Sequence, residues 1–239
     1  MIRYPKTPRL PDWHPEDPSG IRGATAVVEE KVDGANAAVS FEGGELVLQS
    51  RGHVLSGGAG EAQFSMFKAW AAENRAPLRS VLGGRYVAFG EWCYAKHRSF
   101  YDSLPDFFLE FDILDRESGE FLSTGRRRAL LVGGPITSVA VLHEGPLRRV
   151  SNFSQFVGPS RYKSGRWRER FDEAMASGLG RHYAEAETDL TGLMEGVYVK
   201  AETDGRVAAR AKLVRDGFDK VRPDDSRWMR RPIFPNLRA

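Results

Sequence analysis

The chain has 239 residues, of which 41% are hydrophobic and 28% are charged, and its formal net charge at pH 7 is only +3. This composition is typical of a globular protein with one large domain and a sizeable core. No run of about 18 uncharged apolar residues occurs, and residues 1–20 lack the apolar centre of a secretory signal. We therefore expect a cytoplasmic protein with no membrane partner. The single cysteine, Cys93, excludes an internal disulfide and a CxxC zinc site.

Basic residues are clustered in spite of the small net charge. Such clusters suit a phosphate backbone, but they are equally compatible with solvated faces of helices and loops. Charge alone therefore does not decide the function. The clusters are Arg126-Arg127-Arg128, Arg148-Arg149, the segment from Arg161 to Arg170, and the segment from Lys220 to Arg238.

The first half of the chain begins with an arm and continues as strands and one helix. Residues 1–23 are rich in proline, which cannot continue a regular helix, so we expect an extended arm on the body of the protein. Residues 24–50 read as three strands, and Gly43-Gly44 is typical of a tight hairpin between the last two. Residues 61–75 carry aromatic residues at helical spacing and predict a helix packed on a sheet.

The second half is also a mixture of strands and helix. Residues 195–201 and 207–214 read as strands around the turn Thr203-Asp204-Gly205. The other strands are expected at 85–92, 107–114 and 139–142, and a helix at 165–185. This order predicts an α+β fold with largely antiparallel sheets flanked by helices, in one domain from 24 to 239.

Lys31 is the first candidate for chemistry. It lies between Glu29-Glu30, at the end of a predicted strand, and Gly34, so its amine can project from a loop at the end of a sheet. A lysine nucleophile must lose a proton, which requires neighbouring cations or a metal to lower its pKa. Lys-x-Asp-Gly alone is a weak motif, so a surface lysine beside two glutamates, without a catalytic role, is the alternative.

Five further motifs follow Lys31-Val32-Asp33-Gly34 in order. They are Ser50-Arg51-Gly52, Phe89-Gly90-Glu91, Phe111-Asp112-Ile113, Glu195-Gly196-Val197-Tyr198-Val199-Lys200 and Arg210-Ala211-Lys212. The series resembles the covalent nucleotidyltransferases, which comprise RNA ligases, DNA ligases and mRNA capping enzymes. Within this family, Glu30-Lys31 and Asn36 are more similar to RNA ligases of the nick-sealing phage type than to DNA ligases. The stretch 90–97 is similar to bacterial RNA ligases. The resemblance implies a nucleotidyltransferase (ATP-grasp-like ligase) domain.

The resemblance also implies roles for the matched residues. Lys31 would accept AMP from ATP, and Glu195 would bind Mg²⁺ or Mn²⁺, for which oxygen ligands are suited. Asp112 is either a second metal ligand or a structural acceptor. The residues expected to bind ATP are Glu30 at the adenine, Arg51 and Glu91 at the ribose and its phosphate neighbourhood, Phe111 stacked on the base, Lys200, Arg210 and Lys212 at the phosphates, and also Asn36.

Strand periodicity adds two expectations. Arg210 and Lys212 differ by two, so both face one side of a strand, where their field would lower the pKa of Lys31. Phe111 shares its parity with Leu109 and Ile113, so taken alone it reads as a core residue.

The sequence also departs from the family pattern. The last motif usually carries two lysines. Here Arg210 stands in the first position, so a planar guanidinium takes the place of a compact ammonium. The sequence given ends soon after Lys212, without room for the oligonucleotide-binding barrel of DNA ligases and capping enzymes. Residues 143–190 could hold nucleic acid or form a packed peripheral helix, and the second is favoured.

These observations predict an ATP-dependent polynucleotide ligase. The expected substrate is RNA, in a nicked duplex or an RNA/DNA hybrid, with 5′-phosphate and 3′-hydroxyl ends, and a partner protein for end recognition stays open. The alternatives are a minimal ATP-dependent DNA ligase and a non-catalytic nucleic-acid-binding module of the same fold. A capping guanylyltransferase is disfavoured by the missing barrel.

Overall fold

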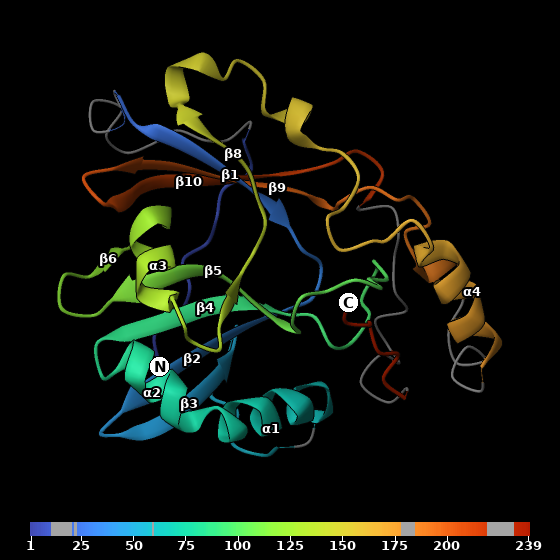
Figure 1. The fold of residues 1–239 in the computed structure, drawn as a ribbon, viewed down its shortest axis with the longest axis horizontal. Coiled ribbons are helices and arrows are strands. Elements are labelled where there is room, and N and C mark those ends of the chain that lie inside the picture. The colour runs from blue at the N-terminus through green and yellow to red at the C-terminus, as the bar shows by residue number, and fades with distance from the viewer. Residues whose placement is uncertain (11–20, 22, 59, 178–184, 219–231) are drawn as a thin grey trace.

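The computed structural model describes residues 1–10, 21, 23–58, 60–177, 185–218 and 232–239. Two sheets lie over one another in layers (Figure 1). The first sheet has the order β10-β9-β1-β8 and is antiparallel. Its strands are β1 (Thr25–Lys31), β8 (Val141–Pro146), β9 (Gly196–Thr203) and β10 (Arg206–Val214).

The second sheet has the order β3-β2-β4-β5-β6, and a short strand pairs with β5 in parallel. Its strands are β2 (Ala35–Glu42), β3 (Glu45–Ser50), β4 (Tyr86–Trp92), β5 (Phe108–Asp115), β6 (Glu120–Phe121) and the parallel β7 (Thr137–Ser138). The α-helices are α1 (Ser65–Glu73), α2 (Arg75–Leu82), α3 (Thr124–Leu131) and α4 (Trp167–Ala176). Short 3₁₀ helices are η2 (Ala62–Phe64), η3 (Leu147–Arg149), η4 (Phe153–Phe156) and η6 (Glu185–Glu187).

The predicted α+β fold with largely antiparallel sheets is confirmed. Both predicted tight turns have positive φ at their central residues, +57° and +87° at Gly43 and Gly44, and +50° and +76° at Asp204 and Gly205. Two successive positive φ values match the twist of antiparallel strands, which is why these residue types occur there. After β10, the described residues 215–218 and 232–239 form no barrel.

Several predicted boundaries were wrong. The helix expected at 61–75 breaks at Asn74 and continues as α2, which tolerates Pro77 because its first turn needs no intrahelical donor. The strand expected at 139–142 forms as β8, two residues later. The helix expected at 165–185 is α4, and part of that range, 178–184, lies outside the described residues.

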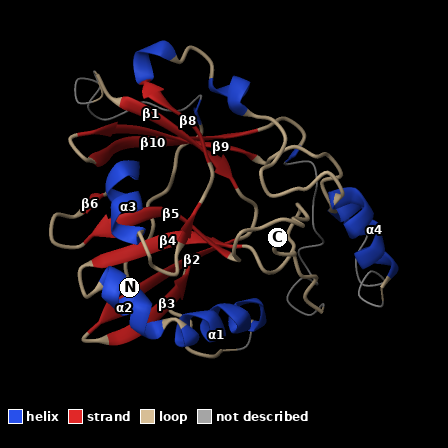
Figure 2. Cartoon of the chain, viewed as in Figure 1, coloured by secondary structure: helices blue, strands red, loops and turns tan. Residues whose placement is uncertain are grey.

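Helices α1 and α2 cover the outer face of the second sheet (Figure 2). Phe67 of α1 is fully buried there, with ring centroids 5.0 Å from Trp92 and 5.3 Å from Phe108. Aromatic burial of this kind is the largest apolar contribution to the fold. This packing holds β4 and β5 in position, and the inner faces of these two strands meet the first sheet.

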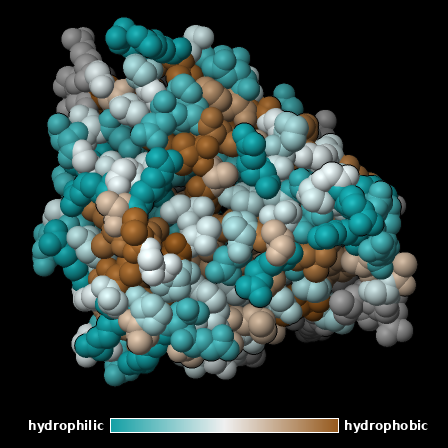
Figure 3. Space-filling model, in the orientation of Figure 1, coloured by the Kyte–Doolittle hydropathy of each residue, from teal (hydrophilic) through white to brown (hydrophobic). Residues whose placement is uncertain are grey.

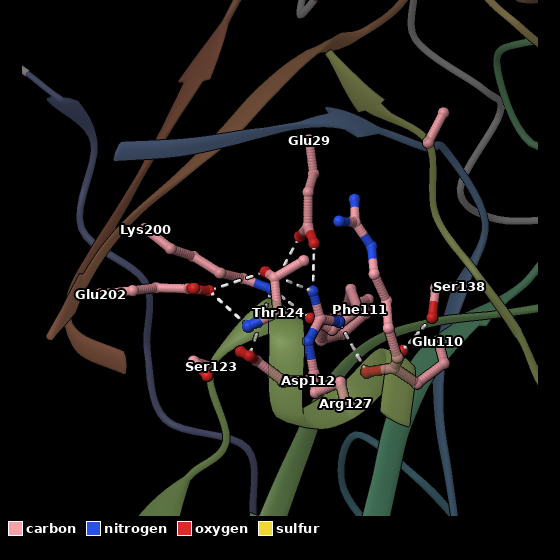
Figure 4. Close-up of polar contacts among 12 residues, drawn as sticks. Glu29, Glu110, Phe111, Asp112, Ser123, Thr124, Arg127, Ser138, Lys200 and Glu202 are labelled. Carbon is pink, nitrogen blue, oxygen red and sulfur yellow. Dashed lines mark hydrogen bonds and ion pairs between the residues drawn. The ribbon is translucent and has the colours of Figure 1, made fainter. Parts of the chain in front are cut away.

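Charged side chains lie between the two sheets, and one of them belongs to the cluster Arg126-Arg127-Arg128, for which the sequence left phosphate binding and a solvated face open. Arg127 of α3 is 1% exposed and bridges Glu29 of β1 and Glu110 of β5, with 2.7 Å between its Nη1 and Glu110 Oε1 (Figure 4). It faces inward because positions 124, 127 and 131 form one buried stripe of α3. The sequence prediction treated Arg126-Arg127-Arg128 as one surface feature and missed this division.

The network continues across the first sheet. Lys200 Nζ of β9 lies 2.7 Å from Glu29 Oε2 and 3.2 Å from Asp112 Oδ1. Glu202 Oε1 accepts hydrogen bonds from the amide and hydroxyl of Thr124, at 2.9 and 2.7 Å. Buried charges are tolerated only when they are paired and hydrogen-bonded, so these contacts fix how the sheets lie on one another.

Residues 1–10 form an arm that contacts both sheets. Gln49 Nε2 of β3 donates to the carbonyl of Ile2 at 2.6 Å, and the amide of Lys212 in β10 donates to the carbonyl of Pro8 at 2.9 Å. The ring of Tyr4 packs between them against Phe89 and Phe111, at 5.2 and 5.1 Å. Residues 11–20 of the predicted arm lie outside the described residues.

The described helices include none long and apolar enough to cross a membrane. On the face shown in Figure 3, hydrophobic residues reach the surface in separate patches among hydrophilic ones. Large exposed hydrophobic side chains such as Val132 and Met66 are scattered over different elements. Single exposed apolar residues of this kind are normal on a protein surface.

We expect Arg127→Ala to lower the free energy of unfolding by about 3–5 kcal/mol, because Glu29 and Glu110 would lose their shared buried cation. Urea denaturation measures the change. The exposed neighbours provide matched controls, and Arg126→Ala and Arg128→Ala should each change stability by no more than about 0.5 kcal/mol. A loss at Arg127 as small as in these controls would contradict a structural role for the network.

Candidate functional site

Lys31 is the last residue of β1 and lies opposite Gly196 of β9. This pairing brings its Nζ to 2.6 Å from Glu195 Oε2, and the two side chains are 14% and 8% exposed. Nζ also lies 5.7 Å from the centroid of the Tyr198 ring. Gly196 is required at this crossing, because a Cβ there would lie 1.9 Å from the carbonyl oxygen of Leu213.

The loop after Lys31 is fixed by Asp33 and Gly34. Asp33 Oδ2 accepts hydrogen bonds from the amides of Arg98 and Ser99 at 2.7 and 2.8 Å. A Cβ on Gly34 would lie 2.7 Å from the carbonyl oxygen of Trp92, closer than real Cβ atoms approach. The acidic and glycine positions of the motif therefore hold the backbone that presents the Lys31 amine.

The C-terminal tail supports the same loop. Asn236 Oδ1 accepts from the amide of Tyr101 at 2.8 Å, and its Nδ2 donates to the carbonyl of Cys93 at 2.7 Å. The Tyr101 hydroxyl in turn accepts from the amide of Asp33 at 2.9 Å. Sequence reasoning missed Asn236, because its partners lie more than 130 residues earlier in the chain.

Two carboxylates surround the Lys31 ammonium. Glu91 of β4 lies opposite Asn36 of β2 in the strand pairing, which brings both predicted residues to one edge of the second sheet. Burial is the main cause that raises the pKa of Glu91 to about 8 and that of Glu195 to about 7. Lys31 lowers both values, so each carboxyl lies within its electrostatic reach.

The expected depression of the Lys31 pKa was wrong for the protein without ligand. Burial by itself lowers this pKa, but the electrostatic interaction with Glu195, followed by those with Tyr198 and Glu91, raises it above the ordinary lysine value. Lys31 is therefore an ammonium ion held by a carboxylate. A nucleophilic attack by this amine would require that the charge of Glu195 be neutralised or moved.

Lys212 and Arg51 add positive charge at the same place. Burial lowers the pKa of Lys212, and the charges of Lys31 and Arg51 lower it further. Arg51 is exposed, just after the end of β3. An anion placed here would meet cations from β1, β10 and the loop after β3.

Phe111 is a buried core residue in one cluster with Leu109, as its parity predicts, but it does not share a face with Ile113. The pairing of β4 with β5 shifts between Phe89, which lies opposite Asp112, and Gly90, which lies opposite Glu110, so Phe111 is the extra residue of a β-bulge. The bulge separates it from Ile113, which packs under α1 and α2. The Phe111 ring instead stacks on Tyr198, with centroids 5.8 Å apart. The sequence prediction missed Tyr198, although it lies inside a matched motif.

Glu30 points away from this site. It follows Glu29 on β1, so it faces the opposite side of the sheet, where its carboxylate accepts from the Ser160 hydroxyl at 2.5 Å and the Arg161 amide at 2.8 Å. The structure thus gives the side chain a structural role in holding the 160–161 segment. It does not bring Glu30 together with Lys31 as the adenine assignment expected.

Lys200, Arg210 and Asp112 form a separate group deeper between the sheets. Lys200 is 2% exposed, and its Nζ donates to the carbonyl of Phe111 in addition to its two carboxylate partners. Arg210 Nη1 donates to Asp112 Oδ2 at 3.0 Å. Asp112 thus follows the structural alternative, and its pairing with both cations occupies the groups expected at metal and phosphate.

The site fits a divalent cation only together with a substrate. Within the described part of the chain, no three His, Cys, Asp or Glu side chains gather as a metal site. The buried Oε2 atom of Glu195 has the Lys31 ammonium as its only partner there. Mg²⁺ typically takes one or two carboxylates plus phosphate oxygens and water. Glu195 offers one such carboxylate, and a bound substrate would supply the phosphate oxygens.

Helix α4 is a packed peripheral helix, as the sequence reading favoured. Its Phe171 is fully buried against Phe100 and Phe234. Arg168 of the helix pairs with Asp172 at 3.1 Å, and Arg166, which directly precedes the helix, pairs with Glu169 at 2.8 Å. These pairs leave little of the helix's positive charge uncompensated.

Comparisons with known proteins agree with this fold. A family model described as RNA ligase matches residues 24–214. A solved structure of Naegleria gruberi RNA ligase with PPi is 17% identical, with a TM-score of 0.64 over 92% of this chain and 57% of that one. A lysine mutant of that ligase with ATP and Mn gives 18%, a TM-score of 0.60, and 92% and 58% coverage. No curated protein matches.

A glutamate mutant of the same ligase with AMP and Mn is 17% identical, with a TM-score of 0.60 over 92% of this chain and 58% of that one. At such identities the likeness shows the shared fold alone. The chain spans a little over half the length of these ligases.

We expect stability to fall as the pH rises through the titration of Glu91. Burial raises its pKa from 4.5 to about 8, so the folded protein keeps a proton that the unfolded chain releases. The stabilisation is therefore complete below the unfolded value and is lost as the pH rises through about 8. Glu91→Gln should reduce the fall in Tm between about pH 5 and pH 9, whereas the exposed Glu73→Gln should keep it. Equal slopes for the two variants would refute this electrostatic assignment.

Proposed function

The chain belongs to the RNA ligase family, and from that premise we propose that it is an ATP-dependent RNA ligase that joins 5′-phosphate and 3′-hydroxyl ends through AMP bound to Lys31. The contact that carries the proposal is the 2.6 Å pair of Lys31 Nζ and Glu195 Oε2. It places an amine at the end of β1, beside a carboxylate able to hold a metal. Lys212 and Arg51 supply the charge that a triphosphate needs.

The first step forms a bond between Lys31 Nζ and the α-phosphorus of ATP. The bond from that phosphorus to the pyrophosphate oxygen breaks, and pyrophosphate leaves with the electron pair. Lys31 must first lose a proton, and its negative neighbour Glu195 opposes this loss. Glu195 would hold a divalent cation, whose positive charge would offset the charge of this carboxylate and of the phosphates. Burial and Lys212 then favour the neutral amine.

The adenine is proposed to stack on the aromatic pair of Phe111 and Tyr198. Base stacking on one aromatic ring is worth roughly 1–3 kcal/mol. Glu91 and Asn36, opposite one another in β2 and β4, face the nucleoside, and Arg51 and Lys212 face the phosphates. This assignment keeps Lys200, Arg210, Asp112 and Glu30 as the residues that hold the sheets and loops in place.

The later steps transfer AMP to RNA and seal it. An oxygen of the RNA 5′-phosphate attacks the AMP phosphorus, the P–N bond breaks, and the Lys31 amine is released. The 3′-hydroxyl then attacks the activated 5′-phosphate, loses its proton, and expels AMP. The protein contributes positioning and charge stabilisation to each transfer.

We expect Lys31→Arg to abolish labelling of the protein by ATP labelled at its α-phosphate in the presence of Mg²⁺ or Mn²⁺. Arginine keeps the positive charge beside Glu195 but remains protonated and cannot attack. Lys6→Ala, at an exposed lysine of the arm, should label like the wild type. An adduct that survives Lys31→Arg, or a wild type that gives none, would refute the proposed chemistry.

We expect the protein to seal a nick with RNA at the 3′-hydroxyl side faster than the same nick with DNA, by at least about tenfold. Substrates that differ only in the 2′-hydroxyl groups of that strand isolate the preference, and the ligated product is measured on a denaturing gel. Equal or faster sealing of the DNA nick would favour the minimal DNA ligase. Adduct formation without sealing of either nick would indicate that a partner or a further domain is needed.

A further inference from the structure

The N-terminal arm brings a second cation to the edge of the first sheet. The amide of Lys212 donates to the carbonyl of Pro8 at 2.9 Å, and Arg9 pairs in register with Lys212 in the parallel sense. Residues in register on adjacent strands project to the same face, about 4.8 Å apart. Arg9 is exposed, whereas Thr7 of the same arm is buried. Arg9 therefore extends the cationic row that begins with Lys212.

Arg210, the other cation of the matched motif, is engaged elsewhere. Its guanidinium lies 3.9 Å from the centroid of the Phe121 ring and 5.2 Å from that of Tyr4. Nη1 donates to Asp112 Oδ2, the oxygen that also accepts from the Tyr4 hydroxyl at 2.5 Å. The side chain is only 12% exposed. Two rings and a carboxylate thus enclose the group that the sequence assigned to phosphate.

The same arm is responsible for both arrangements. Tyr4 closes the enclosure around Arg210 through Asp112, and five residues later Arg9 lies beside Lys212. Two like charges on neighbouring strands repel one another, and an anion between them relieves the repulsion. Burial lowers the pKa of Lys212, and the charge of Arg9 is among the positive charges that lower it further. Arg9 and Lys212 therefore lie within electrostatic reach of one another, and both would face an anion bound at this edge of the sheet.

We propose that Arg9 is a phosphate-binding residue of this site, acting with Lys212, and that Arg210 is instead a structural cross-link between β10 and β5. The inference rests on the proposed ligase function for the identity of the phosphate. A guanidinium beside an ammonium suits an anion with several oxygens, because the planar fork can bind two of them. The phosphate belongs either to ATP in the first step or to the RNA 5′ end in the second.

The test separates these two sources with Arg9→Ala, Arg9→Lys and the control Lys6→Ala. We expect Arg9→Ala to raise KM for ATP in adduct formation, or the RNA concentration needed by preadenylylated enzyme, by roughly tenfold. Arg9→Lys should restore part of the loss, and Lys6→Ala should cause none. Tm should stay unchanged in all three, because Arg9 and Lys6 are exposed.

In contrast to the Arg9 and Lys6 variants, Arg210→Ala should clearly lower Tm. Titration with inorganic tripolyphosphate keeps the inference testable without catalysis, and Arg9→Ala should weaken this binding by roughly tenfold. Unchanged ATP, RNA and tripolyphosphate affinities in Arg9→Ala would overturn the role of Arg9. Arg210→Ala with a normal Tm but weaker tripolyphosphate binding would overturn its structural role. A wild type that binds tripolyphosphate but forms no adduct would refute the proposed function and leave the phosphate site standing.

Discussion

The buried contact of Arg127 with Glu29 and Glu110 is the constraint on which the rest of the structure depends. Two sheets with charged inner faces can approach only if every buried charge finds a partner, and one guanidinium meets both carboxylates. Lys31 lies two residues after Glu29 on the same face of β1, so the network that anchors Glu29 also sets the position of the Lys31 amine, the proposed AMP acceptor. The charges that hold the two sheets together and those of the site therefore lie in one layer between the sheets.

Position along that layer separates structural charges from reactive ones. Lys200 is buried among Glu29, Asp112 and a backbone carbonyl, and a ligand would have to break several contacts to reach it. Lys31 lies at the end of β1, its side chain 14% exposed, with Glu195 as its close partner; a cation could compete with Lys31 for that carboxylate, and a phosphate could compete with Glu195 for the ammonium. The raised pKa of Lys31 thus describes a resting pair, which substrate binding is able to rearrange.

The sequence was sufficient for most of the longer strands, the tight turns and the group formed by Lys31, Glu91, Glu195 and Lys212, but not for the short strands β6 and β7. Local patterns specify strands, and motif order brings distant residues to one place. It was insufficient where a partner far along the chain decides the outcome. Arg127 reads as one of three surface arginines until Glu29, 98 residues earlier, is seen beside it. The bulge at Phe111 is equally invisible, because parity assumes an uninterrupted ladder.

The arm joins these two levels of the structure. β10 is the edge of the first sheet, and an edge strand exposes unpaired backbone groups unless something covers it. The Pro8 carbonyl accepts from the Lys212 amide at this edge, so covering the strand also determines that Arg9 lies beside Lys212. Tyr4 simultaneously ties the arm to Asp112 between the sheets. A change in the arm should therefore affect both the buried charges around Asp112 and the position of Lys212 in the site.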